Sequence, residues 1–107
     1  MIYTEKKRNE MIQKAADFAK YKAQRTALEH YRKVLKARLM KKAMAEGIKT
    51  GQAQEREAYS SPEYEQIIEA IEVATEQETR LYWELNLFQT EVNVWRTEEA
   101  SRRRDEG

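Results

Sequence analysis

The residues that interrupt helices are confined to one short part of the chain. Among 107 residues there are three glycines and one proline. All of these except the last residue lie between positions 47 and 62, as Gly47, Gly51 and Pro62. The sequence on either side consists mostly of strong helix formers, so few long elements are expected. We therefore predict an all-α fold in which two long helices form an antiparallel helical hairpin.

Local signals predict where these helices begin and end. We expect one domain over residues 1–107, with a first helix at about 3–44, a hinge at about 45–61 and a second helix at about 62–104. Ser61 is a good N-cap, Pro62 suits the first helical position, and Glu63 complements the helix dipole. Within the hinge, Thr50 is a possible N-cap for a short helix over residues 52–59.

The second helix has the clearest periodicity. Nine of ten positions separated alternately by three and four residues are apolar. The ten positions are Tyr64, Ile67, Ile71, Ala74, Glu78, Leu81, Leu85, Phe88, Val92 and Trp95. A repeat of 3.5 residues predicts a left-handed, coiled-coil-like seam. Glu78 interrupts this seam, and we expect it to reach solvent, fix the register or meet a base of the first helix.

Both helices also carry apolar residues away from their main apolar faces. The opposite side of the second helix changes from Glu65, Glu69, Glu72 and Glu76 to apolar residues. The apolar face predicted for the first helix consists of Tyr21, Ala23, Ala27, Leu28, Tyr31, Val34, Leu35 and Leu39. Behind that face lie three further apolar residues, Met11, Ala15 and Phe18. In an antiparallel hairpin these portions fall at the same open end. We predict a homodimer that forms a four-helix bundle there, with an interface of Met11, Phe18, Trp83, Leu87 and Val94. A different protein on the same patch is the alternative.

Charge is divided unevenly along the chain. Residues 1–50 carry 14 Lys and Arg against 5 Asp and Glu, whereas residues 51–107 carry 6 against 14. A basic stripe on the first helix is the best candidate for contact with nucleic acid; it consists of Lys22, Arg25, Arg32, Lys33 and Lys36. Basic helix faces are often simply solvated, and an acidic protein is another partner for this stripe.

Residues suited to catalysis or metal binding are scarce. The chain has no cysteine and one histidine, His30, which disfavours a zinc site or a Ser-His-Asp triad. No phosphate-binding loop motif is present. We expect a protein that is not an enzyme and has no metal, cofactor or small-molecule substrate. Because the first residues lack an apolar stretch behind their charges, we also expect a cytoplasmic protein that does not contact membranes.

Several short segments resemble small helical proteins of tailed bacteriophages and prophages. The resemblance covers roughly the C-terminal two thirds and rests on Lys49-Thr50, Arg56-Glu57-Ala58, Ser61-Pro62-Glu63-Tyr64 and Trp95-Arg96-Thr97-Glu98-Glu99-Ala100. Genes of that group often lie near recombination or single-strand-annealing genes, which implies an accessory role in DNA metabolism. The resemblance assigns no residue a role. The hypothesis is a dimeric accessory protein that contacts DNA or a DNA-processing enzyme through the basic stripe. The alternative is an adaptor or inhibitor of a host enzyme that uses the acidic face of the second helix.

Overall fold

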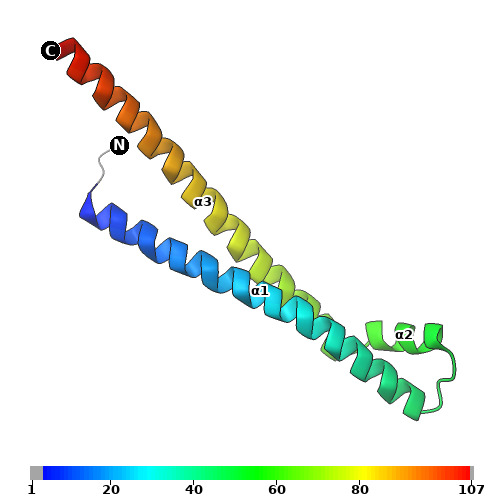
Figure 1. Cartoon of the computed structure of the whole chain (residues 1–107). Coiled ribbons are helices and arrows are strands. Elements are labelled where there is room, and N and C mark those ends of the chain that lie inside the picture. Colours follow the sequence, from blue (N-terminus) through cyan, green and yellow to red (C-terminus); the bar gives the residue numbers. More distant parts are fainter. Residues whose placement is uncertain (1–3, 107) are drawn as a thin grey trace. The chain divides into compact units, whose positions relative to one another are not determined.

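The computed structural model describes residues 4–106, which form three helices and no strand. These are α1 (Glu5–Ala45), α2 (Gly51–Tyr59) and α3 (Pro62–Glu106), as Figure 1 shows. The predicted all-α helical hairpin is confirmed. The predicted start of the first helix at Tyr3 lies outside the described residues.

The connection between the long helices is built from local capping interactions. At the end of α1, Gly47 has φ = 100°. Its amide donates to the carbonyl of Met44, and the amide of Ile48 donates to the carbonyl of Ala43, both at 3.1 Å. This pair of bonds is a Schellman motif, which favours glycine at the left-handed position. The hydroxyl of Thr50 accepts from the amide of Ala53 at 3.1 Å and caps α2, so the predicted short helix in the hinge is confirmed.

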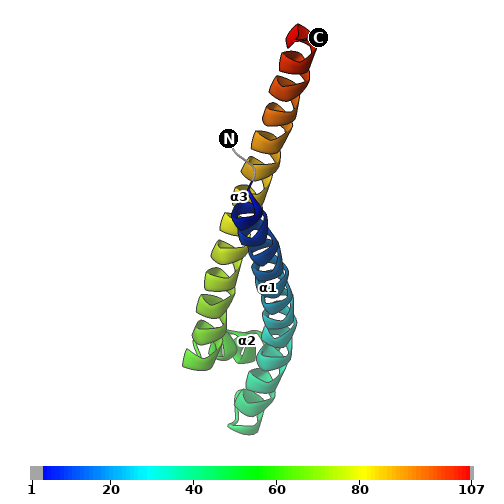
Figure 2. The same cartoon turned by 90° about the vertical axis from the view of Figure 1, so that its left-hand side faces the viewer.

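Contacts divide the chain into two compact units, and both long helices contribute to each. The first unit joins residues 1–20 to residues 77–107. Here α1 and α3 run antiparallel, with an ion pair between Lys14 and Glu84 and the rings of Phe18 and Tyr82 at 6.2 Å. In this unit the last turns of α3 extend past the first turn of α1 (Figures 1 and 2). Among its described residues only Leu81 is buried, with 2% of its surface exposed.

The second unit, Tyr21–Glu76, holds most of the core. Here α2 packs with the later part of α1 and the beginning of α3. The buried residues of this unit are Leu35, Ala43, Ala58, Tyr64 and Ala74. Three of these five are alanines, whose small side chains let helix backbones approach closely. The unit is therefore held by close packing and by polar contacts around Tyr64 more than by large apolar side chains.

The seam predicted on α3 is confirmed by burial. Tyr64, Ala74 and Leu81 are buried, and the other seven predicted positions are half-buried. The apolar face predicted for α1 is partly wrong, because Tyr31 is 41% exposed and Ala23 and Ala27 are also exposed. Ten of the half-buried or buried positions of α1 are instead spaced alternately by three and four residues: Lys7, Met11, Lys14, Phe18, Tyr21, Arg25, Leu28, Arg32, Leu35 and Leu39.

Supercoiling explains why the face of α1 differs from the prediction. A straight helix of 3.6 residues per turn drifts by about 20° per heptad from a repeat of 3.5 residues. Over the four heptads from Met11 to Leu39 this drift reaches about 80°. A face drawn on a straight helix therefore leaves Met11, Arg25 and Arg32 behind the apolar side, whereas the structure has them on the seam.

Candidate functional surfaces

The predicted basic stripe divides into residues that face inward and residues that face solvent. Arg25 is half-buried on the seam and forms an ion pair with Glu29 at 3.3 Å. Arg32 and Lys36 are also half-buried and contact other parts of the second unit. Lys22 and Lys33 are exposed. The prediction that all five cations form one outward surface is therefore wrong for Arg25, Arg32 and Lys36.

The inward cations belong to a polar and aromatic network that joins α1, α2 and α3. Lys36 lies 3.0 Å from the carboxylate of Glu55 and 4.9 Å from the centre of the Tyr59 ring. The hydroxyl of Tyr59 donates to Glu55 at 2.8 Å, and its ring packs edge-on against Tyr64 at 5.2 Å. Arg32 donates to the phenol oxygen of Tyr64 at 3.3 Å. We call these five residues the hinge network.

Ionisation within the hinge network follows from these bonds. Hydrogen bonds from Lys36 and Tyr59 lower the pKa of Glu55, with the charge of Lys36 adding to the effect. The same contacts with Tyr59 and Glu55 raise the pKa of Lys36. Both groups are therefore held in their charged forms at neutral pH. This arrangement suits a structural clamp between α1 and α2, because the cation is already engaged by a carboxylate and by an aromatic ring.

A second set of cations occupies the outer side of α1 in the second unit. No acidic residue occurs between His30 and Ala45, whereas six Lys and Arg do. We define the basic face as the exposed cations Lys22, Lys33, Arg38 and Lys41. No hydrogen bond or ion pair joins the side chains of these four to other residues in the part of the chain that the structure describes. The sequence prediction missed Arg38 and Lys41, although the acid-free segment would have indicated them.

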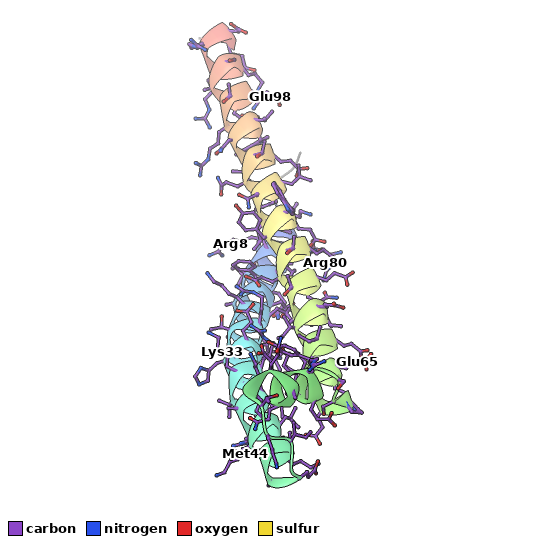
Figure 3. The ribbon with its side chains drawn as sticks, turned by 90° about the vertical axis from the view of Figure 1, so that its right-hand side faces the viewer. Arg8, Lys33, Met44, Glu65, Arg80 and Glu98 are labelled. Atoms are coloured by element: carbon purple, nitrogen blue, oxygen red, sulfur yellow. The ribbon has the colours of Figure 1, made fainter. Side chains whose placement is uncertain are left out.

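An acidic face lies on α3 in the same unit. Glu65, Glu69, Glu72 and Glu76 are all exposed, and none of them pairs with a cation among residues 4–106. Lys33 and Glu65 lie on opposite sides of the unit in Figure 3. The second unit thus presents one basic and one acidic surface, each free to meet a partner of opposite charge.

The first unit exposes large apolar side chains on the outer side of α3. Trp83 is 65% exposed, Leu87 62% and Val94 51%. The interface predicted from the sequence also includes Met11 and Phe18, but both are half-buried on the seam of α1, and the ring of Phe18 lies against Tyr82. Of the five residues of the predicted interface, only the three on α3 are therefore exposed. Tyr82 in turn contacts Trp83, with ring centres 5.4 Å apart.

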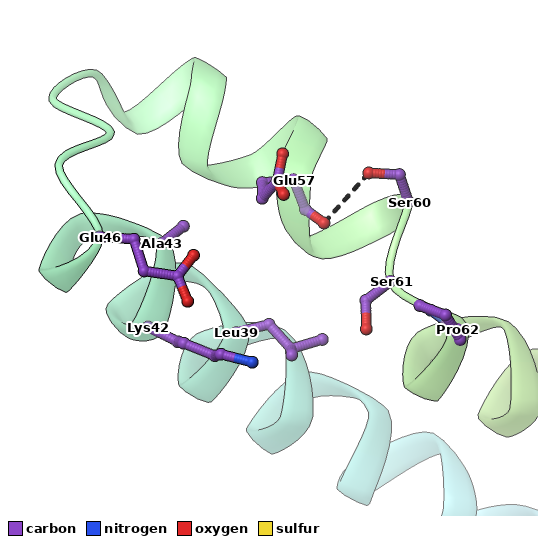
Figure 4. A pocket seen from close by; sticks show the side chains of 8 residues that line it. All are labelled: Leu39, Lys42, Ala43, Glu46, Glu57, Ser60, Ser61 and Pro62. Atoms are coloured by element: carbon purple, nitrogen blue, oxygen red, sulfur yellow. Dashed lines mark hydrogen bonds between the residues drawn. The ribbon is translucent and has the colours of Figure 1, made fainter.

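A hollow of about 220 Å³ lies where the end of α1, α2 and the start of α3 meet in the second unit (Figure 4). Its lining includes Lys42, Glu46 and Glu57, and the Ser60 hydroxyl is bonded to backbone carbonyls. No histidine lines the hollow, so its serines have no imidazole base. Among residues 4–106 no group of three or more His, Cys, Asp or Glu residues could hold a metal ion. Within the same residues no helix is both long and apolar enough to cross a membrane.

In comparisons with known proteins, no family model, no curated protein and no solved structure matches the chain.

Proposed function

We propose that this protein is a non-enzymatic, dimeric helical accessory protein that binds DNA through the basic face of α1. The observation that carries the proposal is the acid-free segment between His30 and Ala45, whose cations Lys33, Arg38 and Lys41 project into solvent without partners. Exposed Lys and Arg that are not paired within a protein are available to neutralise phosphates. The resemblance to small phage proteins supports a place in phage DNA metabolism.

The extent of the basic face suits a nucleic-acid backbone. Lys22 and Lys41 are 19 residues apart, which corresponds to about 28 Å along a helix at 1.5 Å per residue. A contact of this length reads charge and spacing, and the exposed ring of Tyr31 within it can stack on any base. We therefore expect binding without strong sequence preference and with strong dependence on salt.

The test is a titration of labelled single-stranded and double-stranded DNA, followed by fluorescence anisotropy at several salt concentrations. With three or four phosphate contacts, the logarithm of the affinity for duplex should fall with the logarithm of salt with a slope of about −3 to −4. Substitution of Lys33, Arg38 and Lys41 by alanine should remove about three units of that slope. Arg56→Ala is the matched control, because Arg56 is exposed but lies between Glu55 and Glu57. Equal binding by the triple variant and the wild type would refute the proposal.

A second candidate function is supported by the acidic face of α3. Four exposed and unpaired glutamates at helical spacing present a row of negative charge that a basic groove of a host enzyme can accept in place of nucleic acid. In this case the protein acts as an adaptor or inhibitor. Its partner is then a DNA-processing enzyme, and substitution of Glu65, Glu69, Glu72 and Glu76 by glutamine should abolish inhibition of that enzyme while leaving helicity unchanged. The same variant should bind DNA at least as well as the wild type.

A further inference from the structure

The exposed side of α3 in the first unit carries a second seam that no other part of this unit covers. Six exposed residues at spacings of four and three form it, and none is charged: Thr79, Trp83, Leu87, Thr90, Val94 and Thr97. We call this set the outer stripe. From Trp83 onward the spacing alternates between four and three, as in a coiled-coil seam. It lies on the other side of the helix from Leu81, Leu85 and Phe88, which face α1.

Two of the three threonines of the outer stripe, Thr90 and Thr97, have hydroxyls that are already hydrogen-bonded. The hydroxyl of Thr90 donates to the carbonyl of Asn86 at 3.1 Å, and that of Thr97 donates to the carbonyl of Asn93 at 3.0 Å. Each hydroxyl is therefore satisfied within its own helix, and covering it leaves no unpaired donor. For contact with a partner, Thr90 and Thr97 act through their methyl groups.

A shallow hollow on the same stripe has the shape of a coiled-coil hole. It has a volume of about 290 Å³ and is lined by Thr90, Asn93, Val94, Thr97 and Glu98. The first four stand at positions i, i+3, i+4 and i+7, which is the arrangement that receives one side chain of a facing helix. The largest exposed side chain on the stripe is Trp83, which lies 11 residues before Val94.

We propose that two copies of this chain pair antiparallel through α3, so that Trp83 of each copy enters the hollow around Val94 of the other. In this register Trp83 faces Val94 and Leu87 faces Thr90, and a two-fold axis between positions 88 and 89 makes both contacts twice. The inference rests on the dimer of the proposed function and specifies its geometry. It also replaces an interface that includes Met11 and Phe18.

Charge supports this register over a parallel one. Arg80 and Glu98 are 18 residues apart, which is five turns of helix, and both lie on the same side of α3 in Figure 3. The antiparallel register brings Arg80 of one copy beside Glu98 of the other. Glu98 has no partner among the described residues, and Arg80 contacts Glu84 at 3.0 Å on its own helix. A parallel pair would instead place Arg80 beside Arg80 and leave the hollow unfilled.

The first experiment is sedimentation equilibrium of the full chain, without DNA. The wild type should form a dimer. Trp83→Ala should weaken it about a thousandfold, because two large anchors are lost per dimer. Circular dichroism should remain that of the wild type, since Trp83 is largely exposed in a single chain. A wild type that stays at 12.7 kDa, or a dimer indifferent to Trp83→Ala, would overturn the proposal.

Two further experiments test the register. Arg80→Glu or Glu98→Arg alone should weaken the dimer about three- to tenfold, and the double variant should restore it. Glu91→Arg is the control, because position 91 faces Asn86 in this register. Since the chain has no cysteine, a short bis-maleimide should join Arg80→Cys to Glu98→Cys in a mixture and neither protein alone. Linking of Arg80→Cys to itself would instead show a parallel pair and refute the register.

Failure here is distinguishable from failure of DNA binding. A monomer that still binds DNA through Lys33, Arg38 and Lys41 would overturn the pairing of α3 but would support DNA binding by the basic face. A dimer with this register that does not bind DNA would support the pairing of α3 and overturn DNA binding through the basic face.

Discussion

Arg32 and Lys33 are neighbours in sequence, but they differ in burial and in their contacts. Arg32 is half-buried and bonded to Tyr64, whereas Lys33 is exposed on the basic face. We predict that Arg32→Ala destabilises the fold without altering DNA affinity, and that Lys33→Ala lowers DNA affinity without altering stability. The pair is well matched, since each variant removes one positive charge from the same turn of α1.

The magnitude for Arg32 follows from its contact with Tyr64. The hydrogen bond is 3.3 Å long and its acceptor belongs to a residue that is 7% exposed. Loss of such a bond costs about 1 kcal/mol, and loss of the packed aliphatic stem raises the total to about 1–2 kcal/mol. For a chain of this size the melting temperature should fall by about 4–8 °C. Tyr64→Phe removes the same bond, so the two changes together should fall short of additivity by about 1 kcal/mol.

Two measurements decide the matter. Urea unfolding followed by circular dichroism gives the free energies for wild type, both single variants and the Arg32–Tyr64 double variant. Anisotropy titrations over a range of salt give the DNA slope, which should fall by about one unit for Lys33→Ala and stay constant for Arg32→Ala. If Arg32→Ala lowers the slope as much as Lys33→Ala and leaves the unfolding free energy unchanged, the assignment of Arg32 to the hinge network is wrong.

Three other changes test the fold. Leu81→Ala removes the most buried large side chain of the first unit and should cost about 3 kcal/mol in urea unfolding; a cost near zero would mean that this side chain is solvated. Thr50→Ala removes the N-cap of α2 and should cost about 1 kcal/mol, seen as faster hydrogen exchange at the amide of Ala53, while exchange within α3 should not change. Because the pKa of Glu55 lies below its ordinary value of 4.5, its contribution to stability is present above that pH and is lost as the pH falls through the lowered pKa. The free energy of unfolding of Glu55→Gln should therefore fall less with acid than that of the wild type. An identical fall in both proteins would contradict the bond to Lys36.

The features of the fold that follow from local signals were predictable from the sequence. Pro62 begins α3, Thr50 caps α2, and the seam of α3 has the burial that its spacing predicts. Each depends on residues within one or two turns of each other, or on a repeat that nine apolar residues out of ten display.

The orientation of α1 was less predictable, for two physical reasons. Its seam includes Lys14, Arg25 and Arg32, whose charge hides the repeat from any analysis of hydropathy. Their partners are also distant in sequence: Tyr64 lies 32 residues after Arg32, and Glu55 lies 19 residues after Lys36. Long cationic side chains can cover apolar surface with their stems while the charge finds a partner or solvent. A list of cations therefore does not show which of them face outward.

The alternating seam also limits how the length of this protein can change. Deletion of a single residue between Ala74 and Leu81 would turn everything after it by about 100° around α3. Trp83 would leave the outer stripe, and the residues that face α1 would leave the seam with it. Removal of seven residues, matched by seven from the facing part of α1, would preserve both surfaces of α3. Insertions and deletions that keep the hairpin intact should therefore come in whole heptads and in pairs.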